Sequence, residues 1–85
     1  MKELEVPKKV ERFGKLWASL YCVANKNWRQ EQRDIWYSYK GYDLNLYIED
    51  EQLTMSVYPL ADDGTGFMTT DTSTWKTIVQ FGRGA

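Results

Sequence analysis

The stretch IWYSYKGYDLNLYI, residues 35–48, decides the fold, because apolar residues recur at every second position on both sides of a Lys40-Gly41 pair. A period of two places successive side chains on opposite faces of a β-strand. A Lys-Gly pair between two such runs is short enough for a tight hairpin. The stretch therefore predicts two antiparallel strands joined at residues 40–41.

A third alternating run occupies residues 53–58, after a polar turn at residues 49–52, and Pro59 is expected to end it. If Tyr39 pairs with Tyr42, the register of the whole meander is fixed. The face that should meet the core then carries Ile35, Tyr37, Leu44, Leu46, Ile48, Leu53, Met55 and Val57. The opposite face then carries Trp36, Ser38, Asp43, Asn45, Tyr47, Thr54, Ser56 and Tyr58.

Residues 8–25 show the three- and four-residue spacing of an amphipathic helix. Pro7 suits its first turn, where a missing N–H costs nothing. Gly14 lies inside the pattern at a cost of about 1 kcal/mol relative to alanine, which indicates a close approach by another backbone. The side chains expected to pack on the sheet are Phe13, Leu16, Trp17, Leu20 and Tyr21.

The end of the chain fits two structures. Residues 61–66 have the Asp and Gly content of a turn, and residues 67–70 fit a short strand. Residues 72–82 alternate as in a strand, yet Trp75, Ile78 and Val79 also fit one face of a helix. Capping residues at 71–73 and Gly82 at the end favour the helix. The expected fold is α+β: an N-terminal amphipathic helix packed on a three-stranded antiparallel meander, followed by a short helix or a fourth strand.

The length of 85 residues allows a single domain over residues 1–85, with a frayed N-terminus at 1–6 and a flexible C-terminus at 83–85. The lone Cys22 excludes an internal disulfide framework and favours a reducing compartment. The charged N-terminus is no secretory signal, and no apolar run is long enough to cross a bilayer. We therefore expect a cytoplasmic protein.

Catalytic and metal-binding groups are scarce. The chain has no histidine, which removes the commonest general base and the commonest metal ligand. Cys22 falls in the middle of the predicted helix, where nothing activates a thiol. The acidic runs at 49–51 and 62–63 lie in predicted turns and lack the spacing of a calcium loop. The sequence thus predicts a protein that is not an enzyme and that holds neither metal nor cofactor.

The mixed face of the meander is the candidate binding surface. Trp36, Tyr47 and Tyr58 are large rings among small polar neighbours such as Asn45, a composition typical of binding faces. The alternative is that residues 72–82 fold over this face and cover it. Cross-strand ring pairs also stabilise a sheet without any ligand.

Charge is unevenly distributed along the chain. Residues 1–42 carry an excess of four positive charges and residues 43–85 an excess of five negative charges. Either the two halves attract one another, or they offer faces of opposite sign to partners. The acidic groups that would meet a basic partner are Glu49, Asp50, Glu51, Asp62 and Asp63. The basic groups that would contact nucleic acid are Lys8, Lys9, Arg12, Lys15, Arg29 and Arg33.

We expect a small non-catalytic protein-binding module, an inhibitor or accessory protein that occludes a macromolecular partner. Small, cysteine-poor, aromatic-rich chains of this kind resemble phage or plasmid accessory proteins directed against host defences. Nucleic-acid binding by the basic helix face is the alternative, and a homodimer is a third option. The order α-β-β-β-α matches double-stranded RNA-binding domains, but residues 72–75 lack the basic cluster that opens their second helix.

Overall fold

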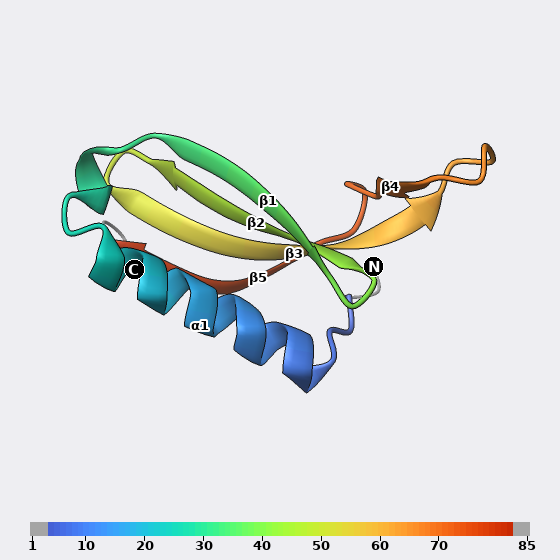
Figure 1. Cartoon of the computed structure of the whole chain (residues 1–85), viewed down its shortest axis with the longest axis horizontal. Coiled ribbons are helices and arrows are strands. Elements are labelled where there is room, and N and C mark those ends of the chain that lie inside the picture. Colours follow the sequence, from blue (N-terminus) through green and yellow to red (C-terminus); the bar gives the residue numbers. More distant parts are fainter. Residues whose placement is uncertain (1–3, 83–85) are drawn as a thin grey trace.

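The computed structural model describes residues 4–82, and there one α-helix packs on a five-stranded antiparallel sheet that curls into a half-barrel (Figure 1). The elements are α1 (Lys8–Ala24), the 3₁₀ turn η1 (Trp28–Gln30), β1 (Arg33–Tyr39), β2 (Tyr42–Glu49), β3 (Gln52–Asp62), β4 (Met68–Thr70) and β5 (Lys76–Gly82). The predicted helix and meander are confirmed. The expectations for residues 1–3 and 83–85 lie outside the described residues.

The predicted register of the meander is also confirmed. Tyr39 pairs with Tyr42, and Leu46 pairs with Ile35 on one side and Met55 on the other. The hairpin between β1 and β2 turns at Lys40 and Gly41, whose φ angles of 50° and 81° are those of a two-residue turn that matches the strand twist.

The hairpin between β2 and β3 turns in the same way without glycine. Asp50 and Glu51 have φ angles of 52° and 63°, in the left-handed region that side chains disfavour. Such a residue costs about 1–2 kcal/mol, which the surrounding ladder must offset. The β2–β3 pairing, which runs from Tyr42 opposite Pro59 to Glu49 opposite Gln52, supplies that support.

Pro59 does not end the third strand, so that prediction is wrong. The pairing of β3 with β2 ends at Pro59, and residues 60–62 pair with β4 instead. The Pro59 carbonyl accepts a hydrogen bond from the Asp71 backbone N–H at 2.9 Å. A proline is tolerated here because its missing N–H falls where one ladder gives way to the next. The predicted strand at 67–70 is confirmed as β4, and it forms a projecting arm with the end of β3 (Figure 1).

The preference for a helix over residues 72–82 is wrong, because β5 is a strand that pairs with β3. Thr77 faces Ser56 and Val79 faces Met55, so Ile78 is an extra residue in a β-bulge. A bulge places two consecutive side chains on one face. This break in the period of two produced the helix-like spacing in the sequence. The match to the double-stranded RNA-binding order fails with it, since the last described element is a strand.

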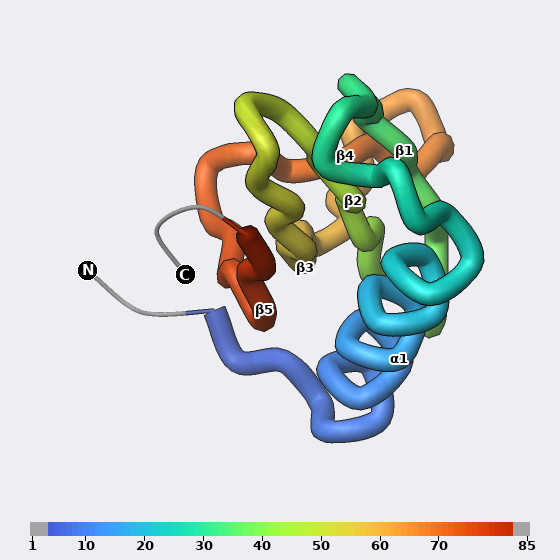
Figure 2. Tube along the Cα trace, turned by 90° about the vertical axis from the view of Figure 1, so that its left-hand side faces the viewer, coloured from blue at the N-terminus to red at the C-terminus, as the bar shows by residue number. Residues whose placement is uncertain are grey.

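The core lies between α1 and one face of the sheet (Figure 2). Its fully buried sheet residues are Leu44, Leu46, Ile48, Leu53, Met55 and Val57. The helix residues that are buried against them are Val10, Gly14 and Ala18. A Cβ on Gly14 would overlap the Ile78 side chain and lie 3.1 Å from Leu44. Side chains of the sheet, and not another backbone as expected, explain this glycine.

Three predicted core residues are exposed. Leu16, Leu20 and Tyr37 retain 55%, 56% and 53% of their accessible surface. α1 contacts the sheet through its small residues Gly14 and Ala18. Its larger side chains Leu16 and Leu20 therefore lie beside the contact between helix and sheet and stay exposed. Phe13, Trp17 and Tyr21 are half-buried and do pack against the core, as predicted.

Candidate functional site

The sheet face opposite α1 is built from rows of residues that cross the strands. One row consists of Trp36, Asn45, Ser56 and Thr77, which belong to β1, β2, β3 and β5. The row on one side consists of Asp34, Tyr47, Thr54 and Gln80, and the row on the other side contains Ser38, Asp43 and Tyr58. The central row is small and polar beyond Trp36, whereas rings rise from both neighbouring rows. This pattern produces a hollow.

An open groove of about 460 Å³ fills this hollow. It is lined by the row that contains Trp36, by the row that contains Tyr47, and by the side chains of Tyr58 and Trp75. Trp36, Tyr47 and Trp75 keep 44%, 40% and 53% of their surface exposed. Residues 72–82 therefore do not cover the aromatic face; β5 widens the sheet, and Trp75 adds a ring to the rim.

Three of the rings form a continuous series across the groove. The Trp36 and Tyr58 ring centroids lie 5.1 Å apart at an interplanar angle of 51°, and those of Tyr58 and Trp75 lie 6.3 Å apart at 31°. Tilted ring pairs at such distances attract one another. The rings come from β1, β3 and the segment before β5, so the fold positions them before any ligand arrives.

The floor of the groove is a fixed polar surface. Asn45 is 7% exposed, and its Nδ2 donates to Asp34 Oδ1 at 2.6 Å and to the Ile35 carbonyl at 3.3 Å. Ser56 and Thr77 place their hydroxyl oxygens 3.3 Å apart. Both hydrogens of the Asn45 amide are thus in use, which fixes the orientation of the side chain.

Asp43, beside the groove, has a structural role. It is 8% exposed, and it accepts hydrogen bonds from Ser38 Oγ at 2.5 Å and from the Thr70 hydroxyl. These bonds connect β2 to β1 and to β4. Charge-assisted hydrogen bonds of this kind compensate for burial of the carboxylate.

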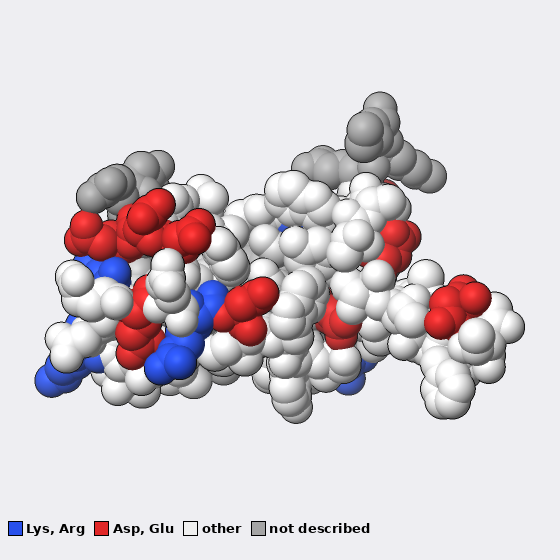
Figure 3. Space-filling model, turned by 90° about the horizontal axis from the view of Figure 1, so that it is seen from above, with Lys and Arg blue, Asp and Glu red and all other residues white. Residues whose placement is uncertain are grey.

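Of the residues that the structure describes, one carboxylate, Asp34, lines the groove, and no Lys or Arg does. At its rim, Glu49 accepts a hydrogen bond from Tyr47 and raises the pKa of that phenol. Acidic side chains lie at one end of this side of the molecule, with Lys and Arg side chains among them, and others follow at intervals towards the projecting arm (Figure 3). Asp50 and Glu51 lie in the turn that follows Glu49.

The predicted acidic pair on the projecting arm does not reach the groove. Asp62 lies about 13 Å along β3 from Tyr58. Asp62 Oδ1 accepts the Gly64 N–H at 2.9 Å, and Asp63 Oδ1 accepts the Thr65 hydroxyl at 2.5 Å. The bond to Thr65 lowers the pKa of Asp63. Both carboxylates therefore stabilise their own loop.

The six basic residues proposed for nucleic acid are divided between two places. Lys8, Arg12 and Lys15 surround Glu11 on the first turns of α1, while Lys9 lies beside Phe13 on another side. Lys15 Nζ is 3.1 Å from Glu11, and this contact lowers the pKa of the Glu11 carboxyl.

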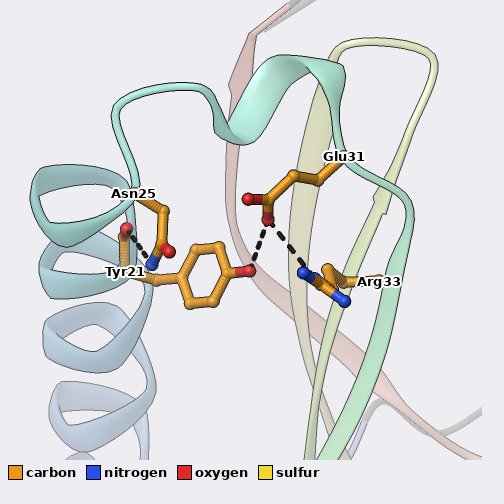
Figure 4. Close-up of polar contacts among 4 residues, drawn as sticks. All are labelled: Tyr21, Asn25, Glu31 and Arg33. Atoms are coloured by element: carbon orange, nitrogen blue, oxygen red, sulfur yellow. Dashed lines mark hydrogen bonds and ion pairs between the residues drawn. The ribbon is translucent and has the colours of Figure 1, made fainter.

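Arg29 and Arg33 lie beyond the other end of the helix. Arg29 stacks over Trp28 at 4.8 Å. Arg33 Nε approaches Glu31 Oε1 at 3.4 Å, and the same oxygen accepts the Tyr21 hydroxyl at 2.6 Å (Figure 4). This cluster connects the last helical turns to the start of β1. The fold therefore does not assemble the six cations into one patch.

The groove contains residues that sequence reasoning did not propose for the site: Asp34, Thr54, Ser56, Trp75, Thr77 and Gln80. Thr54 and Ser56 were placed on the correct face. Asp34 is in phase with Trp36, so an alternation extended by one residue would have found it. Trp75 and Thr77 belong to the strand-like alternation that the bulge obscured.

Among residues 4–82, no cluster of three or more cysteine or carboxylate side chains is arranged to hold a metal ion. In the same part of the chain, no helix is both long and apolar enough to cross a membrane. No protein-family model, curated protein or solved structure matches this chain. Fold and site together define a small α+β domain with an open aromatic groove on its sheet.

Proposed function

We propose that this domain binds a protein partner through the aromatic groove and acts by occluding the partner's surface. The observation that carries the proposal is the set of rings at Trp36, Tyr47 and Trp75, each at least 40% exposed around one hollow. Exposed apolar surface of this kind is unfavourable in water and typically marks an interaction site. Trp and Tyr are also the residues that most often dominate the energy of protein interfaces.

The groove is already assembled, which favours binding. The ring series and the hydrogen-bonded floor restrict the side chains that a partner would contact. A preorganised surface loses less conformational entropy on association. The domain is therefore suited to act as an inhibitor or accessory protein, and a small aromatic-rich chain without histidine fits a phage or plasmid protein directed against a host enzyme.

Nucleic-acid binding has less support. Aromatic sheets that stack single-stranded bases also provide cations along the phosphate path, and no Lys or Arg within residues 4–82 lines this groove. The basic groups on α1 surround a carboxylate and are separated from Arg29 and Arg33.

The test compares partner capture by three forms of the protein. The tagged chain, the double variant Trp36→Ala with Tyr47→Ala, and the control Leu16→Ala with Leu20→Ala are used as bait in extracts of the native host. The control removes exposed apolar surface from α1 and leaves the groove intact. Thermal melting first establishes that all three are folded.

We expect a protein that is captured by the wild type and the control and lost with the groove variant. Titration with that protein in purified form then measures the change in affinity. Capture that survives the groove variant and fails with the control would place the interface on α1 and refute the proposal. Filter binding to DNA and RNA at increasing salt provides the opposing test, since phosphate contacts weaken steeply with salt.

A further inference from the structure

The Asp34–Asn45 pair on the groove floor keeps two free hydrogen-bond acceptors. Asp34 Oδ1 and Asn45 Nδ2 bond to one another, whereas Asp34 Oδ2 and Asn45 Oδ1 accept no hydrogen bond from residues 4–82. Asn45 is more than nine-tenths buried and lines the groove, so its free oxygen is presented to a ligand there. A ligand that satisfies this pair must supply donors.

The charge at the groove favours a cation. Among residues 4–82, Asp34 is the one carboxylate that lines the groove, and no Lys or Arg of this part of the chain lines it. Arg33, its neighbour in the chain, lies on the other face of the sheet, where it contacts Glu31 (Figure 4). Glu49 at the rim adds a second negative charge close to Tyr47. A neutral or anionic ligand would bring no opposite charge to these carboxylates.

The rings specify the shape of the cation. Trp36 is paired with Asn45 and lies two residues from Asp34 on β1, whereas Tyr58 and Trp75 continue the ring series on the side away from Asp34. A guanidinium is planar, stacks on aromatic faces and carries five donors in a fixed fork, whereas an ammonium is a compact and strongly hydrated charge. An arginine side chain can therefore stack on Trp36 and donate to the two acceptors at once, and a lysine satisfies them less completely.

We infer that the groove takes an arginine side chain from a basic segment of the partner, with the guanidinium stacked on Trp36 and donating to Asp34 and Asn45. This inference rests on the proposed function, since it names the chemistry of the partner at the same groove. A glycan would use the same rings, but its neutral hydroxyls would leave the Asp34 charge unpaired.

The test uses three capped peptides of identical Gly/Ser background that carry two arginines, two lysines or two citrullines. Citrulline has the shape of arginine without its charge. Each peptide is titrated into the ¹⁵N-labelled protein, and the indole N–H signals of Trp36 and Trp75 are followed by NMR. We expect the arginine peptide to bind about tenfold more tightly than the citrulline peptide, as for a charge-assisted contact. We expect the lysine peptide to fall between them.

Two variants place the effect on the acceptor pair. Asp34→Asn keeps an oxygen that can accept from Asn45 and removes the charge, so we expect about a tenfold loss of arginine-peptide affinity. Asp62→Asn removes an equally exposed carboxylate from the projecting arm, and we expect it to leave that affinity unchanged. Amide spectra of both variants report whether the fold is intact.

The inference is overturned if the arginine and citrulline peptides bind equally, or if Asp34→Asn binds as the wild type does. Binding of a neutral oligosaccharide such as cellohexaose to the same indole signals, without peptide binding, would overturn it in favour of a glycan site. A host protein whose capture depends on Trp36 and Tyr47 but not on Asp34 would leave the proposed function standing and refute only the arginine inference.

Discussion

The two faces of the sheet formed by β1, β2, β3 and β5 differ in how far their side chains are buried. Leu46 has no accessible surface and lies under α1, whereas Tyr47, the next residue, keeps 40% of its surface exposed at the groove. One face is closed by a helix that rests on small residues. The other is left open because its central row is small and its neighbouring rows carry rings. Residues that form the core and residues that line the groove therefore alternate along β2.

This division can be tested by substituting neighbours on opposite faces. A change on the α1 side should reduce the free energy of unfolding, and a change on the groove side should reduce binding with little effect on folding.

Leu46→Ala should produce the largest loss of stability. The side chain is fully buried between α1 and the sheet, so truncation removes apolar burial and leaves a cavity. We expect the free energy of unfolding to fall by about 2–5 kcal/mol. Urea denaturation followed by circular dichroism measures it, and a fall below about 1 kcal/mol would contradict a core on this face.

Gly14→Val should destabilise through overpacking. Its Cβ would overlap the Ile78 side chain, and overpacked cores lose about 1–3 kcal/mol. Combining it with Ile78→Val removes the overlapping methyl group, so the double variant should lose less than the sum of the two single losses. Strict additivity in the same urea experiment would show that the two residues are not coupled.

Trp36→Ala should leave the protein folded. The ring makes one tilted contact with Tyr58 and is 44% exposed, so we expect a loss of about 1 kcal/mol of stability or less. The affinity of this variant for the partner should be lower than that of the wild type, because Trp36 lines the groove. A loss as large as that of Leu46→Ala would erase the difference between the faces.

The smallest effect concerns the groove rim at high pH. Glu49 raises the pKa of Tyr47 above its ordinary value of 10.0 by accepting its hydrogen bond. The stabilisation from this bond is therefore fully present below pH 10 and is lost as the pH rises through the raised pKa. Glu49→Gln should move the phenol pKa back towards 10, as followed by ultraviolet titration of tyrosinate. An unchanged titration would show that the Glu49 charge does not act on Tyr47.

The meander was predictable because its first hairpin fixes everything after it. Once Lys40 and Gly41 occupy a two-residue turn, the alternation assigns every later side chain to a face. The same reasoning located Trp36, Asn45, Tyr47 and Tyr58 correctly, and all four line the groove.

Other features depend on tertiary packing that local patterns do not encode. The helix contacts the sheet through Gly14 and Ala18. A prediction based on the large apolar side chains alone therefore places the contact to one side of these two residues. The bulge at Ile78 changes the period of β5 and imitates a helix. The carboxylates of Asp62 and Asp63 look like a charged surface in sequence, yet each binds backbone N–H groups of its own loop.

The bulge in β5 and the glycine in α1 depend on one another. Ile78 is a one-residue insertion into a ladder that would otherwise alternate regularly, and the methyl end of its side chain occupies the space where Gly14 lacks a Cβ. The two positions form a matched pair across α1 and β5. Space for a larger side chain at residue 14 is therefore controlled from β5, a strand that lies more than sixty residues further along the chain.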